Sequence, residues 1–365
     1  MAGTAPLSRE VEFPLSCREL VREVDTELAR LLRERRAHMV TGDSGVARLF
    51  EELERILGAG GKRLRPVFCL LGYRAGGAEL GPEILRSAAA LELLHTFAIV
   101  HDDVMDRSRV RRGLPASWVE LAEAHRREAM RGDAASFGVA AAVLVGDLAL
   151  ILADQAFLGS GFPPPRLLPA WDRYNRMRAD MVAGQYLDVL AAHAGSMGEA
   201  ESRRVAVLKS GLYTVEGPLH IGCLLASGRP EVVTMLSRYG VPLGEAFQIR
   251  DDVLGVFGDP SATGKDRDSD LREGKRTVLV ARTLALVGEE DRRFIEERLG
   301  RSDLPAEDVD RIRSLMEASG ALASTLRLIE ELTEQAKAAV DPEAVPAEVA
   351  ETLRDLADVL ALRGA

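Results

Sequence analysis

Apolar residues recur at intervals of three and four positions along almost the whole chain. This spacing places them on one side of an α-helix. Ala and Leu, both strong helix formers, predominate in LVREVDTELARLLRERR (20–36), LRSAAALELLHTFAIV (85–100), GVAAAVLVGDLALILADQAF (138–157) and AETLRDLADVLALRG (350–364). Alternating runs of Val, Ile and Thr are lacking, so few or no strands are expected. The pattern predicts an all-α fold.

Composition limits the class of protein. With 365 residues and 47% hydrophobic side chains, the chain can bury a sizeable core. Its formal charge of −10 disfavours nucleic acid and anionic membranes as partners. The three cysteines, Cys17, Cys69 and Cys223, form no CxxC pair, which suits a reducing compartment. The sequence has no signal-peptide pattern and no run of about 18 uncharged apolar residues, so we expect a cytoplasmic protein without a transmembrane segment.

Glycine, proline and charged residues interrupt the helical pattern at a few places. These breaks lie at 58–66, 159–169, 191–199 and 257–276, and none has the composition of an interdomain linker. The last break is the longest, and it is expected to be a functional loop.

Three carboxylates follow a buried apolar run in HTFAIVHDDVMDRSRVRRG (95–113). Asp102 and Asp106 lie one helical turn apart, so both carboxylates emerge on one face of the helix. A buried acidic cluster costs several kcal/mol unless cations neutralise it. Oxygen-only ligands suit Mg²⁺, which commonly links protein carboxylates to substrate phosphates. Asp103 is expected to accept a hydrogen bond from a neighbouring donor, in support of the metal ligands. A second acidic pair, Asp251 and Asp252, ends the similar segment FQIRDDVLG (247–255).

Basic residues accompany the first acidic group. Asp106 is followed by four arginines, and GGKRLRP (60–66) adds Lys62, Arg63 and Arg65 behind glycines that permit close approach of the backbone. Carboxylates for metal beside guanidinium groups for phosphate predict a diphosphate-binding site.

These segments together resemble the trans-isoprenyl diphosphate synthases, or polyprenyl synthetases. The resemblance covers about residues 50 to 280 and follows the family order of motifs, which here read GGKRLRP, LLHTFAIVHDDVMD with RRG, GQYLDV, KSGLYTVEGPLHIG, FQIRDD and GKDRDSDLREGKRT. It implies a single domain over 1–365, a large helical bundle around a deep central cavity. The N-terminal helix and the C-terminal helices would pack on the motif-bearing core. It also implies a homodimer.

The same resemblance implies the site and its cofactor. About three Mg²⁺ ions, with Mn²⁺ as a possible substitute, would be held by Asp102, Asp106 and Asp251. The allylic diphosphate (dimethylallyl, geranyl or farnesyl) would be bound by Arg111, Lys209, Ser210, Gln248, Lys265 and Lys275. The diphosphate of isopentenyl diphosphate would be bound by Lys62, Arg65, His95 and Arg112. The residues expected to act in catalysis are Asp102, Asp106, Arg111, Lys209, Asp251 and Lys265.

One position of the second acidic motif departs from the family pattern. The second acidic motif of the family is usually DDxxD, but Gly255 stands where its third aspartate would be. This reduces the ligands for the third ion without abolishing the site, and Gly255→Asp is expected to leave metal affinity unchanged or modestly tighter. Gln185 and Asp188, in GQYLD, are expected to face the cavity.

Product length depends on the residues just before the first acidic group. Phe97 and Ala98 lie five and four positions before Asp102, about 6 to 7.5 Å down that helix. Helical geometry puts Ala98 under Asp102 and Phe97 to one side, so geometry alone does not make Phe97 the floor of the cavity. In the family, an aromatic residue at the fifth position is typical of twenty-carbon synthases. The resemblance therefore implies geranylgeranyl diphosphate, with farnesyl or longer products as alternatives, unless Phe97 is ordinary core packing.

Two other functions remain to be weighed. A class I terpene cyclase also uses DDxxD, but its Asn, Ser and Glu motif is lacking and GGKRLRP would serve no purpose there. A non-catalytic subunit of a heteromeric synthase would be free to lose charged site residues, and this chain keeps nearly all of them.

Overall fold

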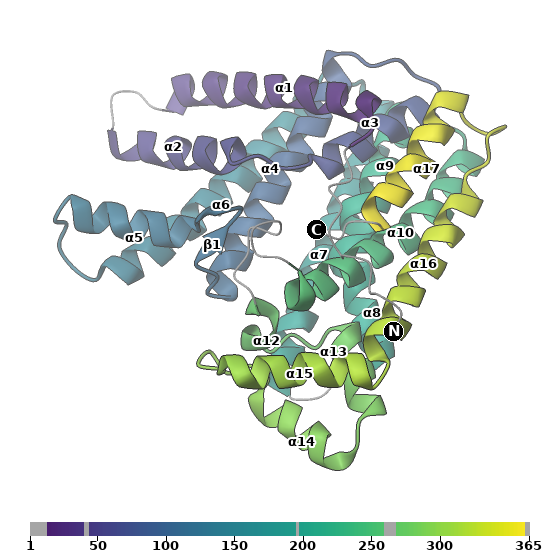
Figure 1. The fold of residues 1–365 in the computed structure, drawn as a ribbon. Coiled ribbons are helices and arrows are strands. Elements are labelled where there is room, and N and C mark those ends of the chain that lie inside the picture. Colours follow the sequence, from purple (N-terminus) through teal and green to yellow (C-terminus); the bar gives the residue numbers. More distant parts are fainter. Residues whose placement is uncertain (1–12, 40–43, 195–196, 259–267, 362–365) are drawn as a thin grey trace.

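The structure is a computed structural model that describes residues 13–39, 44–194, 197–258 and 268–361. It is all-α, as the spacing of apolar residues predicts, and the helices assemble into one bundle (Figure 1). The α-helices, in chain order, are α1 (Leu15–Met39), α2 (Ser44–Gly58), α3 (Leu64–Ala75), α4 (Pro82–Met105), α5 (Ser117–Arg127), α6 (Ala134–Leu158), α7 (Pro164–Ala194), α8 (Glu199–Ala206), α9 (Gly217–Leu225), α10 (Pro230–Phe257), α12 (Ser269–Glu273), α13 (Val278–Leu286), α14 (Glu289–Arg298), α15 (Ala306–Ala318), α16 (Ala321–Ala339) and α17 (Ala347–Ala361).

One small β-hairpin departs from the all-helical expectation. β1 (Val110–Arg111) and β2 (Leu114–Pro115) pair antiparallel through a two-residue turn at Arg112 and Gly113. Both turn residues have positive φ, 53° and 73°, as a type I′ turn requires. The hairpin carries two of the arginines predicted to bind diphosphate.

A proline-rich break is shorter than the sequence suggested. The segment 159–169 was expected to lie outside helices, but α7 begins at Pro164 and Pro169 lies inside its first turns. Pro164 suits the first position of α7, whose amide has no intrahelical partner, whereas Pro169 lies further inside the helix and removes one backbone hydrogen bond. Likewise, the long break 257–276 contains the short helix α12.

A π-helical segment, η1 (Val207–Glu216), joins α8 to α9 without a break. Its backbone packs directly against α10, since a Cβ on Gly244 would lie 2.3 Å from Cα of Gly211. The other side of η1 is equally close to α7, where a Cβ on Gly184 would lie 2.7 Å from the backbone nitrogen of Lys209. Glycines thus let three backbones meet at a segment whose irregular turns are often found at functional sites.

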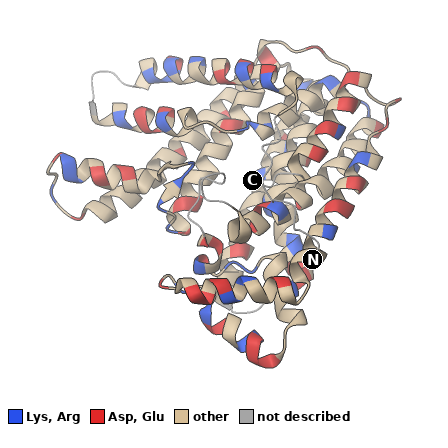
Figure 2. Ribbon diagram, viewed as in Figure 1, with Lys and Arg blue, Asp and Glu red and all other residues tan. Residues whose placement is uncertain are grey.

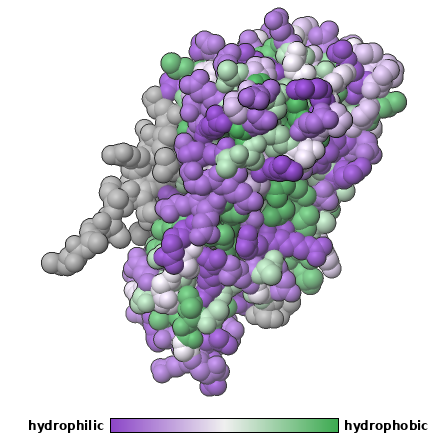
Figure 3. Space-filling model, turned by 90° about the vertical axis from the view of Figure 1, so that its right-hand side faces the viewer, coloured by the Kyte–Doolittle hydropathy of each residue, from purple (hydrophilic) through white to green (hydrophobic). Residues whose placement is uncertain are grey.

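The core has two buried apolar clusters. The larger gathers residues of α1 to α4, α6, α7, α9 and α17, and the smaller those of α10, α13, α15 and α16. Helix α10 contributes to both, with Leu236 in the first and Ile249 in the second. Charged residues are frequent on outer helices such as α1, α14 and α15 (Figure 2), and the side shown in Figure 3 is mostly hydrophilic.

Within the described residues, two helices are long and apolar enough to cross a membrane, by length and composition alone. In α4, 61% of the apolar window is buried inside the protein, as in a core helix. In α6 the buried share is 39%, because several large apolar side chains on this helix are exposed. Helix α6 therefore carries an apolar outer face.

Candidate active site

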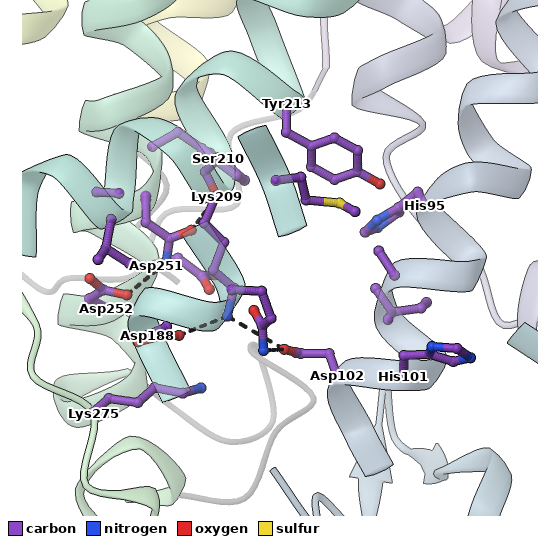
Figure 4. A pocket seen from close by; sticks show the side chains of 18 of the residues that line it. His95, His101, Asp102, Asp188, Lys209, Ser210, Tyr213, Asp251, Asp252 and Lys275 are labelled. Carbon is purple, nitrogen blue, oxygen red and sulfur yellow. Dashed lines mark hydrogen bonds and ion pairs between the residues drawn. The ribbon is translucent and has the colours of Figure 1, made fainter. Parts of the chain in front are cut away.

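A cavity of about 690 Å³ lies between α4 on one side and η1, α7, α10 and α12 on the other. One part of its lining is charged, and the other is apolar, with Phe97, Ala98, Met181, Val182 and Phe247. In Figure 4, His95, His101 and Asp102 come from one wall, whereas Asp251, Asp252 and Lys275 come from the opposite wall. Such a cavity suits a ligand with an anionic head and an apolar tail.

The first acidic group lies where α4 ends. Three donors from other elements contact Asp102. Gln185 Nε2 lies 2.9 Å and Lys209 Nζ lies 3.4 Å from Oδ1 of Asp102. Arg111 Nη2 lies 3.4 Å from Oδ2 of the same residue. Lys209 also pairs with Asp188 at 2.9 Å. Gln185 and Asp188 therefore do face the cavity.

Asp103 has a different position from its neighbours. It is buried and accepts hydrogen bonds from the guanidinium of Arg111, with Nε 2.9 Å from its Oδ1. Burial raises the pKa of Asp103, and the charge of Arg111 opposes this rise. The aspartate thus orients Arg111 beside Asp102, as expected of a supporting residue.

Asp106, which follows the last residue of α4, is also largely enclosed. Burial, followed by the charge of Asp102, raises its pKa to about 6, and Lys275 opposes the rise. The Nζ of Lys275 lies 3.4 Å from Asp106 Oδ2. Burial works against the charge of Lys275 itself, but Asp270 and Glu273 outweigh this and raise its pKa well above the usual value.

The second acidic pair lies on α10 across the cavity. Asp251 and Asp252 both line it, and Gln248 links this pair to η1 by donating to Asp252 Oδ1 at 2.7 Å and accepting from Ser210. Burial, then the charge of Asp270, raises the pKa of Asp252 to about 8. Burial is the larger cause of this rise, and the neighbouring carboxylate of Asp270 adds to it.

The expectation that Gly255→Asp leaves metal affinity unchanged or modestly tighter stays a prediction. A Cβ at position 255 would lie 2.0 Å from Oδ2 of Asp270, so the side chain of Asp270 would have to shift to admit an aspartate there. Sequence analysis assigned no role to Asp270, and the only signal that could have found it is its position in DSDLREGK, five residues before Lys275. It is buried and lines the cavity together with Asp251 and Asp252.

A separate basic group occupies the part of the cavity near α3. It consists of Lys62, Arg65, His95 and Arg112, all of which line the cavity. Arg112 reaches the carbonyl of Gly60, and Gly61 makes this possible because a Cβ there would lie 2.9 Å from Arg112 Nη1. The hairpin and the glycine turn thus meet at one point.

Two polar atoms of this basic group are buried and find no hydrogen-bond partner among the described residues, Arg65 Nε and His95 Nδ1. Arg65 is fixed by Thr214 at 2.8 Å and by the ring of Tyr213, 4.2 Å from its guanidinium carbon. Burial, then the charges of Arg65 and Arg112, lowers the pKa of His95, so its imidazole is neutral. Buried polar atoms without partners suit a site that receives an anionic ligand.

Arg63, which lies between Lys62 and Arg65 in the segment GGKRLRP, has a structural position in the protein. Arg63 is buried in a structural ion pair, 2.8 Å from both Asp25 and Glu92. It holds the glycine turn against α1 and α4. Lys265 lies outside the described residues.

The carboxylates fit Mg²⁺, the metal expected here. In the described part of the chain no three His, Cys, Asp or Glu side chains close around one point. Mg²⁺ keeps several waters and is usually held by one or two carboxylates together with substrate phosphates. Asp102 and Asp251 line the cavity from opposite walls and would supply oxygen ligands of this kind. Asp106 lies beside Lys275, which also lines the cavity.

Comparison with known proteins identifies the class. The family described as Polyprenyl synthetase matches residues 46–318. A geranylgeranyl diphosphate synthase of Sulfolobus acidocaldarius is 33% identical over 277 residues, 74% of this chain and 76% of that protein. A geranylfarnesyl diphosphate synthase of Aeropyrum pernix is 34% identical over 271 residues, 73% of this chain and 79% of that protein.

A solved structure agrees over nearly the whole length. The geranylgeranyl pyrophosphate synthase of Corynebacterium glutamicum, complexed with isoprenyl diphosphate and magnesium, has a TM-score of 0.91 and 33% identity, covering 94% of this chain and 98% of that one. The chain belongs to the polyprenyl synthetase family. It is a transferase of isoprenoid biosynthesis, a trans-prenyl diphosphate synthase.

Proposed function

We propose that the chain condenses isopentenyl diphosphate with an allylic diphosphate in the presence of Mg²⁺ and that its main product is geranylgeranyl diphosphate. The observation that carries this proposal is the division of one cavity into two basic groups, with the clustered aspartates Asp102, Asp251, Asp252 and Asp270 beside only one of them. A synthase must bind two diphosphates and ionise just one. A class I cyclase has no use for the second basic group.

Each basic group is assigned one substrate. Arg111, Lys209 and Lys275 lie among the carboxylates, and with Ser210, Gln248 and Lys265 they bind the allylic diphosphate. The group of Lys62, Arg65, His95 and Arg112 binds isopentenyl diphosphate, to which neutral His95 can donate without adding charge. Asp102, Asp106 and Asp251 would hold Mg²⁺, which supplies positive charge against the departing diphosphate.

The reaction begins when the allylic carbon–oxygen bond breaks and its electron pair leaves with the diphosphate. Half-buried Lys209 and Arg111 stabilise that negative charge, and they act more strongly than in bulk water because the cavity encloses them in part. The double bond of isopentenyl diphosphate then attacks the allylic cation. A proton leaves for the released diphosphate, and the chain is five carbons longer.

Product length is proposed from the apolar part of the cavity. Phe97 and Ala98 line it below Asp102, and Phe97 is the larger of the two. Relatives of similar identity are named for products of different length, a geranylgeranyl and a geranylfarnesyl diphosphate synthase. The proposal of a twenty-carbon product therefore rests on Phe97.

We also propose a single cytoplasmic domain that forms a homodimer. Support for one domain comes from α10, which contributes to both buried clusters. Support for the dimer comes from the apolar face of α6, where Val139, Val143, Leu144, Ile151 and Leu158 are exposed. A second copy of the same face would cover it.

The decisive experiment is incubation of the purified chain with Mg²⁺, isopentenyl diphosphate and each allylic diphosphate in turn. Mass spectrometry of the products should show elongation, chiefly to twenty carbons. Cyclised products would indicate a cyclase, and a folded chain without turnover would indicate a non-catalytic subunit.

A further inference from the structure

The space beside Gly255 is filled from another helix. Gly255 follows Asp251 by one helical turn on α10, so a side chain there would emerge on the same face as Asp251. An ideal Cβ at this position would lie 2.0 Å from Oδ2 and 2.7 Å from Cγ of Asp270. The carboxylate of Asp270 therefore occupies the space that the side chain of an aspartate at position 255 would need.

We propose that Asp270 replaces the missing third aspartate of the second acidic motif and that Gly255 is required to admit it. Asp270 and Asp251 would then serve the same metal ion, with Asp270 acting directly or through a bound water. This inference rests on the proposed function, because it concerns the metal that the proposed reaction needs.

The position of Asp270 is held by contacts on both sides. Asp270 is only 5% exposed. Lys275 donates two hydrogen bonds to Asp270, one from its backbone amide to the backbone carbonyl at 3.0 Å and one from Nζ to Oδ1 at 3.2 Å. One carboxylate oxygen thus faces a lysine and the other faces Gly255. The side chain of Asp270 on α12 therefore points toward α10.

Arg313 of α15 fixes α12 against the end of α10. Its Nε donates to the carbonyl of Val256 at 2.8 Å, and its Nη2 pairs with Asp268, the residue before α12. The residue next to Gly255 and the residue two before Asp270 are therefore bound by one guanidinium. These two contacts of Arg313 hold Asp270 close to Gly255.

Lys275 connects the two acidic walls. Its Nζ lies 3.4 Å from Asp106 and 3.2 Å from Asp270, so a single cation partly neutralises both groups. Carboxylates that need one shared lysine carry more negative charge than the protein itself compensates. A purely structural Asp270–Lys275 ion pair would instead make Asp270 important for stability alone, and the two roles can be separated.

The test counts bound Mn²⁺, which reports metal directly and does not depend on turnover. Electron paramagnetic resonance would follow Mn²⁺ titrated into the full chain with inorganic diphosphate. Asp270→Asn keeps the size of the side chain, and it should weaken at least one Mn²⁺ by tenfold or more. The exposed Asp303→Asn, whose side chain is 73% exposed, makes the same change of charge and should leave binding unchanged.

A reciprocal exchange tests the geometry. Gly255→Asp alone should weaken the same Mn²⁺, because the new side chain collides with Asp270. Gly255→Asp combined with Asp270→Gly should recover binding to within about threefold, because one carboxylate again occupies the shared space. If the Mn²⁺ affinity of the double variant exceeds that of both single variants, the two substitutions interact, as expected when one carboxylate replaces the other.

Two outcomes would overturn the inference. One is Asp270→Asn binding Mn²⁺ as tightly as Asp303→Asn, and the other is a folded double variant that binds no better than either single variant. If the double variant does not fold, Asp270→Asn alone decides. If the unaltered chain makes no prenyl diphosphate, the proposed function fails, whereas the Mn²⁺ result still stands.

Discussion

The imidazole of His101 lies edge-on to the ring of Phe97, with centroids 4.7 Å apart and planes at 61°. His101 Nε2 is 3.0 Å from the carbonyl of Val143 on α6, and a Cβ at Gly146 would lie 2.3 Å from its Cδ2. Helix α6 thus holds His101, and His101 supports Phe97. The residue proposed to limit product length is therefore backed by a neighbouring helix rather than by α4 alone.

Phe97→Ala is expected to lengthen the product beyond twenty carbons, because removing the ring opens the apolar part of the cavity. Mass spectrometry of the products measures the change. Phe294→Ala on α14 is a matched control, since it removes an equal ring that does not line this cavity, and it should leave the distribution largely as it was. An unchanged distribution in an active Phe97→Ala enzyme would mean that another residue stops the chain.

Asp102→Ala and Asp106→Ala should each lower kcat by orders of magnitude without unfolding the protein. Losing a metal removes several kcal/mol of transition-state stabilisation, and each ~1.4 kcal/mol corresponds to about tenfold in rate. Initial rates at saturating Mg²⁺ measure the loss, with circular dichroism to verify folding. Asp147→Ala, an exposed aspartate on α6, should retain activity. Comparable activity in Asp102→Ala would refute its role.

The two diphosphate sites should be separable by kinetics. Arg65→Ala should raise the KM for isopentenyl diphosphate by about tenfold or more, the size expected for a lost charge-assisted hydrogen bond. Lys209→Ala should act mainly on the allylic substrate, because Lys209 lies beside Asp102 and Asp188. Equal weakening of both substrates in each variant would contradict the assignment.

Stability without metal should fall as pH rises. The folded-state pKa of Asp252 is raised to about 8, so the folded protein keeps a proton that the unfolded chain loses above its ordinary value near 3.8. The stabilising contribution is complete below that value and is lost as pH rises through the folded pKa, by up to about 1 kcal/mol per pH unit. Urea unfolding from pH 5.5 to 8.5 measures the slope.

Asp252→Asn should flatten this dependence, since the amide cannot titrate. Asp303→Asn should retain the slope of the unaltered protein, because its carboxyl group is exposed. Equal slopes in the two variants would show that Asp252 is not the titrating group.

Leu144→Glu on the apolar face of α6 should convert a dimer to monomers, because a charge placed in an apolar interface loses its hydration. Analytical ultracentrifugation across a range of concentrations measures the mass. Leu286→Glu on α13 is a matched control, since both leucines are 56% exposed. A monomeric unaltered protein, or a dimer that survives Leu144→Glu, would contradict the proposed interface.

Local sequence determined the helical class and the first acidic group. The spacing of apolar residues alone predicted α4 and α6, because an amphipathic or buried helix repeats every 3.6 residues whatever it packs against. Asp102 and Asp106 lie near each other for the same local reason. The motifs in family order predicted the class of enzyme, because residues that bind diphosphate and metal recur in short fixed patterns.

Tertiary packing alone decided which distant residues meet. Asp270 faces Gly255 because Arg313 binds α12 to α10, and no local pattern announces such a contact. Lys275 joins Asp106 to Asp270 across two elements far apart in sequence, and the carbonyl of Val143 on α6 binds His101, which lies one helical turn after Phe97 on α4. Such contacts depend on how helices dock, and docking is fixed by the complementary shapes of many side chains rather than by the periodicity of any one segment.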